Sequence, residues 1–277
     1  MKVALTGAGG MLGHAVVRVF ADAELVPFTR ADFDITSLDD TVKKIRDAHP
    51  DFLIHAAAFT NVDACETEPE AAYLINGVGT RNVVMACEEI HCPVIHISSD
   101  YVFDGSKTTP YDEWDTPNPV SRYGVSKLMA EQFVLSLTNR FYIVRTSWLF
   151  GRNGRNFVDT VLRLLAEKDP LRVVNDQFGS PTFTDDLALT IRQLLGHGYG
   201  IYHVTNTGVC TWYEFAVEIA EMKGVRKEII PVTSMEFSRP ARRPANSALN
   251  DTMLRLERIG PLRHWEDALN AYLTQTP

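Results

Sequence analysis

Cysteine is scarce in this chain of 277 residues, and its spacing matches neither a metal site nor a redox motif. The four cysteines are Cys65, Cys87, Cys92 and Cys210, and none of them forms a CxxC pair. A disulfide framework needs denser cysteine in a shorter chain. The eight histidines contain no HxxxH pair, which would favour a transition metal. We therefore expect free thiols and no bound metal.

Long hydrophobic runs and an excess of basic residues are also missing. No stretch approaches the roughly 18 uninterrupted apolar residues of a membrane span. The first glycine, Gly7, comes too early for the apolar region of a signal peptide, so we expect a cytoplasmic protein. The net charge of −8 disfavours nonspecific binding to nucleic acid or to an anionic membrane. Apolar residues make up 45% of the chain, which is enough for a sizeable core.

The first half of the chain instead alternates short β-rich runs with helical patterns. Strands are expected at 2–6, 24–28, 51–55, 93–98 and 141–146. Helices are expected at about 10–21, 38–48, 69–89 and 123–137. This alternation predicts right-handed crossovers, and therefore an α/β fold with a doubly wound parallel sheet of the Rossmann type.

After residue 151 the alternation becomes less regular. Helices are expected at 157–168, 185–195, 212–222 and 264–273, with a turn-rich loop at 176–182 and an Arg/Pro-rich loop at 239–243. The pattern predicts a dinucleotide-binding domain over 1–150 and a smaller, mainly substrate-binding lobe over 151–277. A late segment near 183–200 is expected to pack back on the first domain.

A glycine-rich loop follows the first strand and opens the first helix. Gly7 permits a tight turn, Gly10 lets the backbone approach a pyrophosphate, and Gly13 lets the helix lie close to the strand. Met11 and Leu12 lie at the start of this helix, where free N–H groups and the helix dipole favour an anion. We therefore predict dinucleotide binding here and not a plain tight turn.

The ends of the second and third strands carry further candidates for cofactor binding. Arg30 could hold a 2′-phosphate with the help of the Thr29 hydroxyl, and an acid such as Asp34 could meet the ribose. Asp32 is a second such acid, and Ile35 is also expected to contact the cofactor. The alternative is that Arg30, Asp32 and Asp34 are solvated turn residues. Residues 56–58 are all alanine, which would let a cofactor lie across the strand ends or let a helix pack closely. We expect NADPH, with NADH also accepted.

A tyrosine and a lysine four residues apart are the candidate reacting groups. Tyr123 and Lys127 lie on one face of the same predicted helix. We expect the cation to lower the pKa of the phenol from its usual value of about 10, which would make the phenol a proton donor and acceptor near neutral pH. Lys127 could also hold the nicotinamide ribose. Ser98 and Ser99 end the fourth strand, where a hydroxyl can hydrogen-bond a substrate carbonyl.

With these motifs the chain resembles the extended short-chain dehydrogenase/reductases, and more closely the dTDP-4-dehydrorhamnose reductase family. The GxxGxxG spacing matches the superfamily. The resemblance covers nearly the whole chain, and the matching stretches are 56–63, 98–105, 123–128, 145–151, 156–158, 176–182 and 239–240. Two short segments differ from the common pattern: Met129 and Ala130 replace an Ala-Gly pair, and Thr29 and Arg30 stand where some members have an acid.

The resemblance implies roles for individual residues. The catalytic set of the family corresponds to Ser99, Tyr123 and Lys127. Trp148 corresponds to a tryptophan that packs near the sugar, although a tryptophan usually fills a core. An arginine fork such as that of Arg239 suits a diphosphate, although Arg239, Arg242 and Arg243 could also form a solvated basic loop. The implied substrate-binding residues are Ser99, Tyr101, Tyr123, Trp148, Asn156, Gln177 and Arg239.

The implied activity is hydride transfer from NAD(P)H to C4 of dTDP-4-dehydro-L-rhamnose, which yields dTDP-L-rhamnose. Two alternatives remain open at this point. One is a non-catalytic NADP-binding regulatory subunit, and the other is a nucleotide-sugar 4-epimerase or dehydratase of the same fold. Some members of the family are metal-linked dimers, but this sequence has no clear acidic cluster for a metal. A homodimer remains an open alternative to a monomer.

Overall fold

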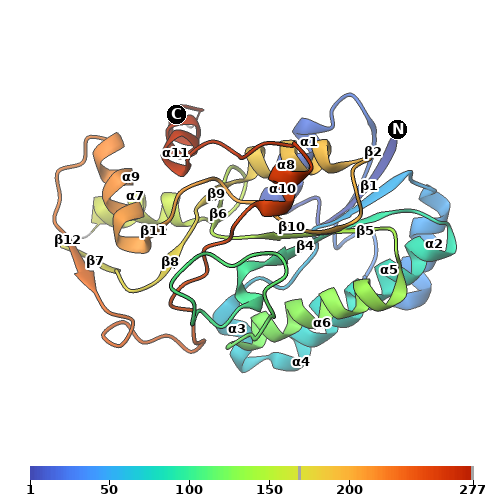
Figure 1. The fold of residues 1–277 in the computed structure, drawn as a ribbon, viewed down its shortest axis with the longest axis horizontal. Helices are drawn as coiled ribbons and strands as arrows, with labels where there is room; N and C mark the ends of the chain where they lie inside the picture. Colours follow the sequence, from blue (N-terminus) through green and yellow to red (C-terminus); the bar gives the residue numbers. More distant parts are fainter. Residues whose placement is uncertain (168–169, 276–277) are drawn as a thin grey trace.

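The computed structural model describes residues 1–167 and 170–275, and a parallel sheet forms the centre of its larger part (Figure 1). The sheet has six strands in the order β10-β5-β4-β3-β1-β2, and every neighbouring pair is parallel. The expected doubly wound α/β fold is therefore confirmed. The strands are β1 (Lys2–Thr6), β2 (Glu24–Phe28), β3 (Phe52–His55), β4 (Val94–Ser99), β5 (Phe141–Thr146) and β10 (Gly200–His203).

Helices cover both faces of this sheet (Figure 1). On one face, α1 (Met11–Val19) and α8 (Thr184–Leu194) pack against each other and against the sheet. The other face carries α2 (Leu38–Ala48), α5 (Gly79–Glu89) and α6 (Arg122–Leu137). Each residue of β4 is buried because helices cover the strand from both sides, as is usual in parallel sheets.

The single long helix expected at 69–89 contains a wider turn. The segment begins as α4 (Pro69–Ala72), continues as the π-helical η1 (Tyr73–Val78) and ends as α5. Within η1, the Asn76 amide donates to the Ser126 hydroxyl of α6 at 2.8 Å and accepts from the Phe59 backbone N–H at 2.7 Å. The wider turn thus ties this helix to α6 and to the segment after β3. Such turns often occur at functional sites.

The second half of the chain builds a smaller lobe with its own aromatic core (Figure 1). The loop expected at 176–182 contains two short strands. The helix expected at 157–168 is described over 157–167, and Lys168 lies outside the described residues. Further short elements are α3 (Val62–Thr67), η2 (Asp100–Val102) and α10 (Thr252–Leu256). The elements of the lobe are β6 (Leu149–Phe150), α7 (Phe157–Glu167), β7 (Leu171–Val174), β8 (Phe178–Gly179), β9 (Thr182–Phe183), β11 (Cys210–Thr211), α9 (Trp212–Met222), β12 (Ile229–Val232) and α11 (Trp265–Gln275).

Three late segments join the sheet layer instead of the lobe. Helix α8 packs on α1, β10 pairs with β5 at the edge of the sheet, and α10 packs against β10. The division into a dinucleotide-binding domain over 1–150 and a mainly substrate-binding lobe over 151–277 stays a prediction. None of the helices within 1–167 and 170–275 is long and apolar enough to cross a membrane.

A buried ion pair joins α6 to the sheet. Arg145 of β5 donates from Nε to Glu131 Oε1 at 2.9 Å and from Nη2 to Oε2 at 2.7 Å. The two side chains are 2% and 1% exposed. The Ser98 hydroxyl of β4 also donates to Glu131 Oε1, at 2.6 Å. Two strands and the helix are therefore held by one carboxylate.

We expect Glu131→Gln to destabilise the protein because it leaves the Arg145 guanidinium buried without its counter-charge. The free energy of unfolding should fall by about 3–5 kcal/mol, as measured by urea denaturation. Glu167→Gln is the control, because its ion pair with Arg163 is exposed and should contribute only about 0.5 kcal/mol. Equal losses in the two variants would contradict this interpretation.

Candidate active site

A cleft of about 1000 Å³ opens at the carboxyl ends of the parallel strands. Its walls come from the loops after β1, β2, β3, β4 and β5, from the start of α6 and from the smaller lobe. The cleft lies where the strand order reverses, because β1 is flanked by β2 on one side and β3 on the other. Ligands of doubly wound folds bind at this position.

The glycine loop lies close to the neighbouring strand end. Gly7 has a φ of +77°, and a methyl group there would lie 2.6 Å from the Ala57 backbone nitrogen. At Gly13 a methyl group would lie 2.7 Å from the backbone of Ala8. Gly10 begins α1 without a side-chain cap, which leaves N–H groups of the first turn available to an anion. Residues 7, 10–13 and 56–58 all line the cleft.

The segment after β2 forms the far end of the cleft, where Arg30, Asp34 and Ile35 line it. The Thr29 hydroxyl donates to Asp32 at 2.8 Å, and the Asp32 carboxylate also accepts from the Thr29 backbone. The expectation that Thr29 donates to a 2′-phosphate is therefore not met, because the hydroxyl already has an acceptor within its own turn. Hydrogen bonds from Thr36 lower the pKa of Asp34, and the charge of Arg30 adds to the effect.

Tyr123, Lys127 and Ser99 lie together in the cleft. The Ser99 hydroxyl lies beside the Tyr123 phenol and donates to Asp100 Oδ1 at 2.9 Å. Lys127 is 3% exposed, and its ammonium donates to the Ile97 carbonyl of β4 at 2.6 Å. By contrast, the Ser98 hydroxyl is engaged by Glu131, which leaves Ser99 as the serine hydroxyl next to the phenol.

The electrostatics of this group differ from the expectation. Burial raises the pKa of Tyr123, the hydrogen bond from Ser99 lowers it, and the charge of Asp100 raises it again. Burial also lowers the pKa of Lys127 to about 8, while the charge of Glu131 opposes this shift. The expectation that Lys127 lowers the pKa of the phenol is wrong for this arrangement. Desolvation of the phenolate outweighs the attraction of a cation that is itself directed at a backbone carbonyl.

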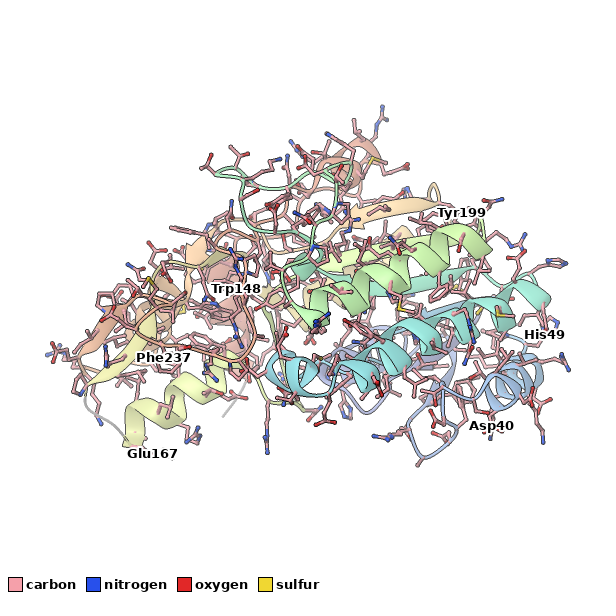
Figure 2. The ribbon with its side chains drawn as sticks, turned by 90° about the horizontal axis from the view of Figure 1, so that it is seen from below. Asp40, His49, Trp148, Glu167, Tyr199 and Phe237 are labelled. Carbon is pink, nitrogen blue, oxygen red and sulfur yellow. The ribbon has the colours of Figure 1, made fainter. Side chains whose placement is uncertain are left out.

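Trp148 marks the place where the two halves of the chain meet (Figure 2). It follows β5, lines the cleft and adopts a left-handed backbone with a φ of +46°. Its ring stacks on that of Trp212, with centroids 3.5 Å apart and an interplanar angle of 7°. Tyr101 also lines the cleft, and its ring contacts that of Tyr123 edge to face at 5.6 Å.

Three residues implied for the substrate do not line the cleft. The Asn156 side chain accepts from the Asp159 N–H at 3.0 Å and donates to the Gly151 carbonyl, so it caps α7. Gln177 donates to the Ser234 hydroxyl at 2.8 Å. The Arg239 guanidinium lies 3.6 Å from the Asp63 carboxylate, and the Arg239 side chain is half exposed. Their role at a substrate stays a prediction that this arrangement does not support.

Several residues of the cleft belong to none of the motifs seen in the sequence. Asp100 is 2% exposed, and burial raises its pKa to about 7 against the hydrogen bonds from Ser247 and Ser99. Its position directly after Ser99 was the available signal. Arg155 lines the cleft from the smaller lobe, where the adjacent Gly154 packs against Met11 at the start of α1. No local pattern marks Trp212 as a residue of the cleft, because many helices begin with an aromatic residue.

The described residues hold no group of three or more histidine, cysteine or acidic side chains that could bind a metal ion. The four cysteines are all buried and unpaired. Burial raises the pKa of Cys65 to about 11, so this thiol is a poor nucleophile near neutral pH.

We expect the Lys127 ammonium to titrate near pH 8, below its ordinary value of 10.5, because burial disfavours the cation. It is therefore charged below about pH 8 and neutral above. The measurement is the ¹³Cε shift in protein labelled with [¹³C]lysine, assigned through loss of the signal in Lys127→Met. Glu131→Gln should lower the midpoint further, since the Glu131 charge raises the pKa of Lys127. A midpoint near 10.5 would contradict the buried position.

Comparison with known proteins gives a consistent result. A family model described as "RmlD substrate binding domain" matches residues 1–277. The spore coat polysaccharide biosynthesis protein SpsK of Bacillus subtilis is 42% identical, over 99% of this chain and 97% of its own. A dTDP-4-dehydrorhamnose reductase of Sinorhizobium fredii is 38% identical, over 97% and 95%. The solved dTDP-4-dehydrorhamnose reductase of Bacillus anthracis in complex with NADP is 40% identical, with a TM-score of 0.97 and 99% of each chain covered.

Proposed function

We propose that this chain, which belongs to the RmlD substrate binding domain family, is an NADPH-dependent oxidoreductase that reduces the C4 keto group of dTDP-4-dehydro-L-rhamnose to give dTDP-L-rhamnose. The observation that carries the proposal is the group of Ser99, Tyr123 and Lys127 in one cleft with the glycine loop. The names of the relatives supply the substrate, and the NADP in the related crystal structure supplies the cofactor.

The residues of the cleft fit a dinucleotide along its length. Gly7 and Gly13 leave no room for a side chain, and the uncapped first turn of α1 suits a pyrophosphate. Among the described residues that line the cleft, the basic side chains are Arg30, Arg155 and Lys127. Arg30 lies at the adenosine end, Arg155 lies beside the start of α1, and Lys127 lies at the reacting end. We assign the 2′-phosphate to Arg30 and the pyrophosphate to Arg155.

Bound NADPH would supply a hydride to the carbonyl carbon. The residues of the cleft must then hold the carbonyl oxygen and give it a proton. The Tyr123 phenol is protonated at neutral pH because burial raises its pKa, so it can donate a proton to the oxygen at C4. Ser99 can hold that oxygen while charge develops, since its hydroxyl already lies against the phenol. Lys127, which is a cation below about pH 8, would hold the nicotinamide ribose at the reacting end of the cleft.

The alternatives have weaker support. Solved structures of a UDP-glucose 4-epimerase and a dTDP-glucose 4,6-dehydratase cover 99% of this chain at 18% identity, which shows a shared fold alone. The non-catalytic regulatory subunit needs no proton donor, whereas this cleft brings a phenol, a hydroxyl and an ammonium together. A nucleotide-sugar substrate fits a cytoplasmic enzyme, and a homodimer stays a prediction.

We expect the purified protein to oxidise NADPH when dTDP-4-dehydro-L-rhamnose is added, and NMR to identify the product as dTDP-L-rhamnose. Tyr123→Phe should lower kcat by about 10²–10⁴-fold, because it removes the transferable proton and keeps the ring. NADPH binding by the variant should remain, as measured by fluorescence titration.

Several outcomes would contradict this function. Lack of NADPH oxidation with any 4-keto sugar nucleotide would favour a binding subunit. A tightly bound NAD in the absorbance spectrum of fresh protein would favour an epimerase or dehydratase. Near wild-type turnover by Tyr123→Phe would remove the assigned role of the phenol.

We expect Arg30→Ala to raise the KM for NADPH by about 10- to 150-fold, since it removes a charge-assisted hydrogen bond to the 2′-phosphate. The KM for NADH should change little, because NADH lacks this phosphate. Arg155→Ala is the matched control and should weaken both cofactors alike. Equal effects of Arg30→Ala on NADPH and NADH would show that another group selects the cofactor.

A further inference from the structure

We propose that Trp212 and Gly179 are positioning residues that hold the Trp148 indole as a flat wall of the substrate subsite. This inference rests on the proposed function, because it concerns the sugar end of the same cleft. It depends on the placement of three residues that are distant in sequence. None of the motifs that identify the reacting groups includes Trp212 or Gly179.

Trp148 lies at the reacting end of the cleft. Ser99 and Thr146 are paired across β4 and β5, and Trp148 follows two residues after Thr146. All three residues line the cleft. A ligand that brings a carbonyl to Ser99 and Tyr123 therefore has Trp148 as a neighbour.

The Trp148 backbone is held in an uncommon conformation. Its φ of +46° lies in the left-handed region, which a bulky residue rarely adopts without support. The support comes from both sides: the Thr182 N–H donates to the Trp148 carbonyl at 3.2 Å, and the Ser147 hydroxyl donates to the Ser180 carbonyl at 2.6 Å. The backbone thus directs the indole toward the smaller lobe.

Trp212 covers one face of this indole. The two rings are parallel within 7° and 3.5 Å apart between centroids. Trp212 is itself anchored, because its ring also contacts Phe157 at 4.5 Å and it begins α9 next to a capping box formed by Thr211 and Glu214. A sugar therefore cannot reach the face of Trp148 that Trp212 covers.

Gly179 lies over the indole ring itself. A methyl group at this position would lie nearest to Trp148 Cε2, with Nε1 at 2.6 Å and Cζ2 at 2.7 Å, too close for any real contact. Gly179 pairs with Cys210 in the β8–β11 ladder, and Trp212 follows β11 directly. One short strand pair therefore brings both positioning residues to the Trp148 ring.

The stack has a spectroscopic signature that requires no turnover. Two stacked indoles in contact couple their electronic transitions, so we expect a pair of bands of opposite sign in the far-UV circular dichroism spectrum of the wild type. Trp212→Phe and Gly179→Ala should each reduce this couplet, the first by removing one indole and the second by displacing Trp148. Trp114→Phe is the matched control, because Trp114 is 64% exposed and lies outside the cleft lining.

The kinetic consequence should be confined to the sugar nucleotide. Trp212→Ala should raise the KM for the sugar nucleotide by about 2- to 12-fold, the range expected for loss of one aromatic pair. Trp212→Phe should recover part of this loss, and Gly179→Ala should reproduce it with Trp212 intact. The Kd for NADPH should stay within about twofold in all variants, since the glycine loop and Arg30 lie elsewhere in the cleft.

The outcomes separate this inference from the proposed function. An unchanged couplet in both Trp212→Phe and Gly179→Ala would overturn the positioning role, whatever the substrate is. A reduced couplet with an unchanged KM, or with an equal loss of NADPH affinity, would also overturn it. If Trp212→Ala does not fold, the couplet and the KM of Trp212→Phe and Gly179→Ala still test the positioning role. Failure of the wild type to reduce a dTDP-4-keto sugar would overturn the proposed function and leave the couplet as the test of the stack.

Discussion

The buried ion pair between Glu131 and Arg145 is the interaction on which the geometry of the cleft depends. Glu131 lies one helical turn after Lys127 on α6, and it also accepts a hydrogen bond from Ser98, the residue before Ser99. Arg145 precedes Thr146 and leads directly to the segment of Trp148. Because each partner is adjacent to a residue of the cleft, one bidentate contact holds the ammonium, the serine hydroxyl and the indole in a common frame.

Burial shifts the titratable groups of the cleft toward their neutral forms. It raises the pKa of Tyr123 and of Asp100 and lowers that of Lys127 to about 8. Burial and, to a smaller extent, the charge of Lys127 lower the pKa of His55 to about 3. The His55 imidazole therefore stays neutral and adds no second positive charge near Lys127. The result is a phenol that keeps its proton, beside an ammonium whose charge is sensitive to pH above neutrality.

The two parts of the molecule contribute different things to the cleft. The sheet and its loops supply the glycine turn and the reacting groups, which the fold places at the reversal of strand order. The smaller lobe supplies Trp212 and Arg155, and its aromatic core supports the wall of the cleft through Phe157. A UDP-glucose 4-epimerase shares this fold at 18% identity, so the fold by itself does not fix the substrate.

Local sequence patterns were sufficient for five of the six strands of the sheet, for the glycine loop and for the spacing of Tyr123 and Lys127, whereas the edge strand β10 was not expected. Periodicity and turn residues act over a few positions, so several elements have the expected bounds. These are the strands at 2–6, 24–28 and 141–146 and the helices at 38–48 and 212–222. The tertiary structure alone decided the pKa directions, the engagement of Ser98 by Glu131 and the exclusion of Asn156, Gln177 and Arg239 from the cleft lining. It also decided the stack of Trp212 on Trp148. Burial and side-chain partners come from residues distant in the chain, and no local pattern contains them.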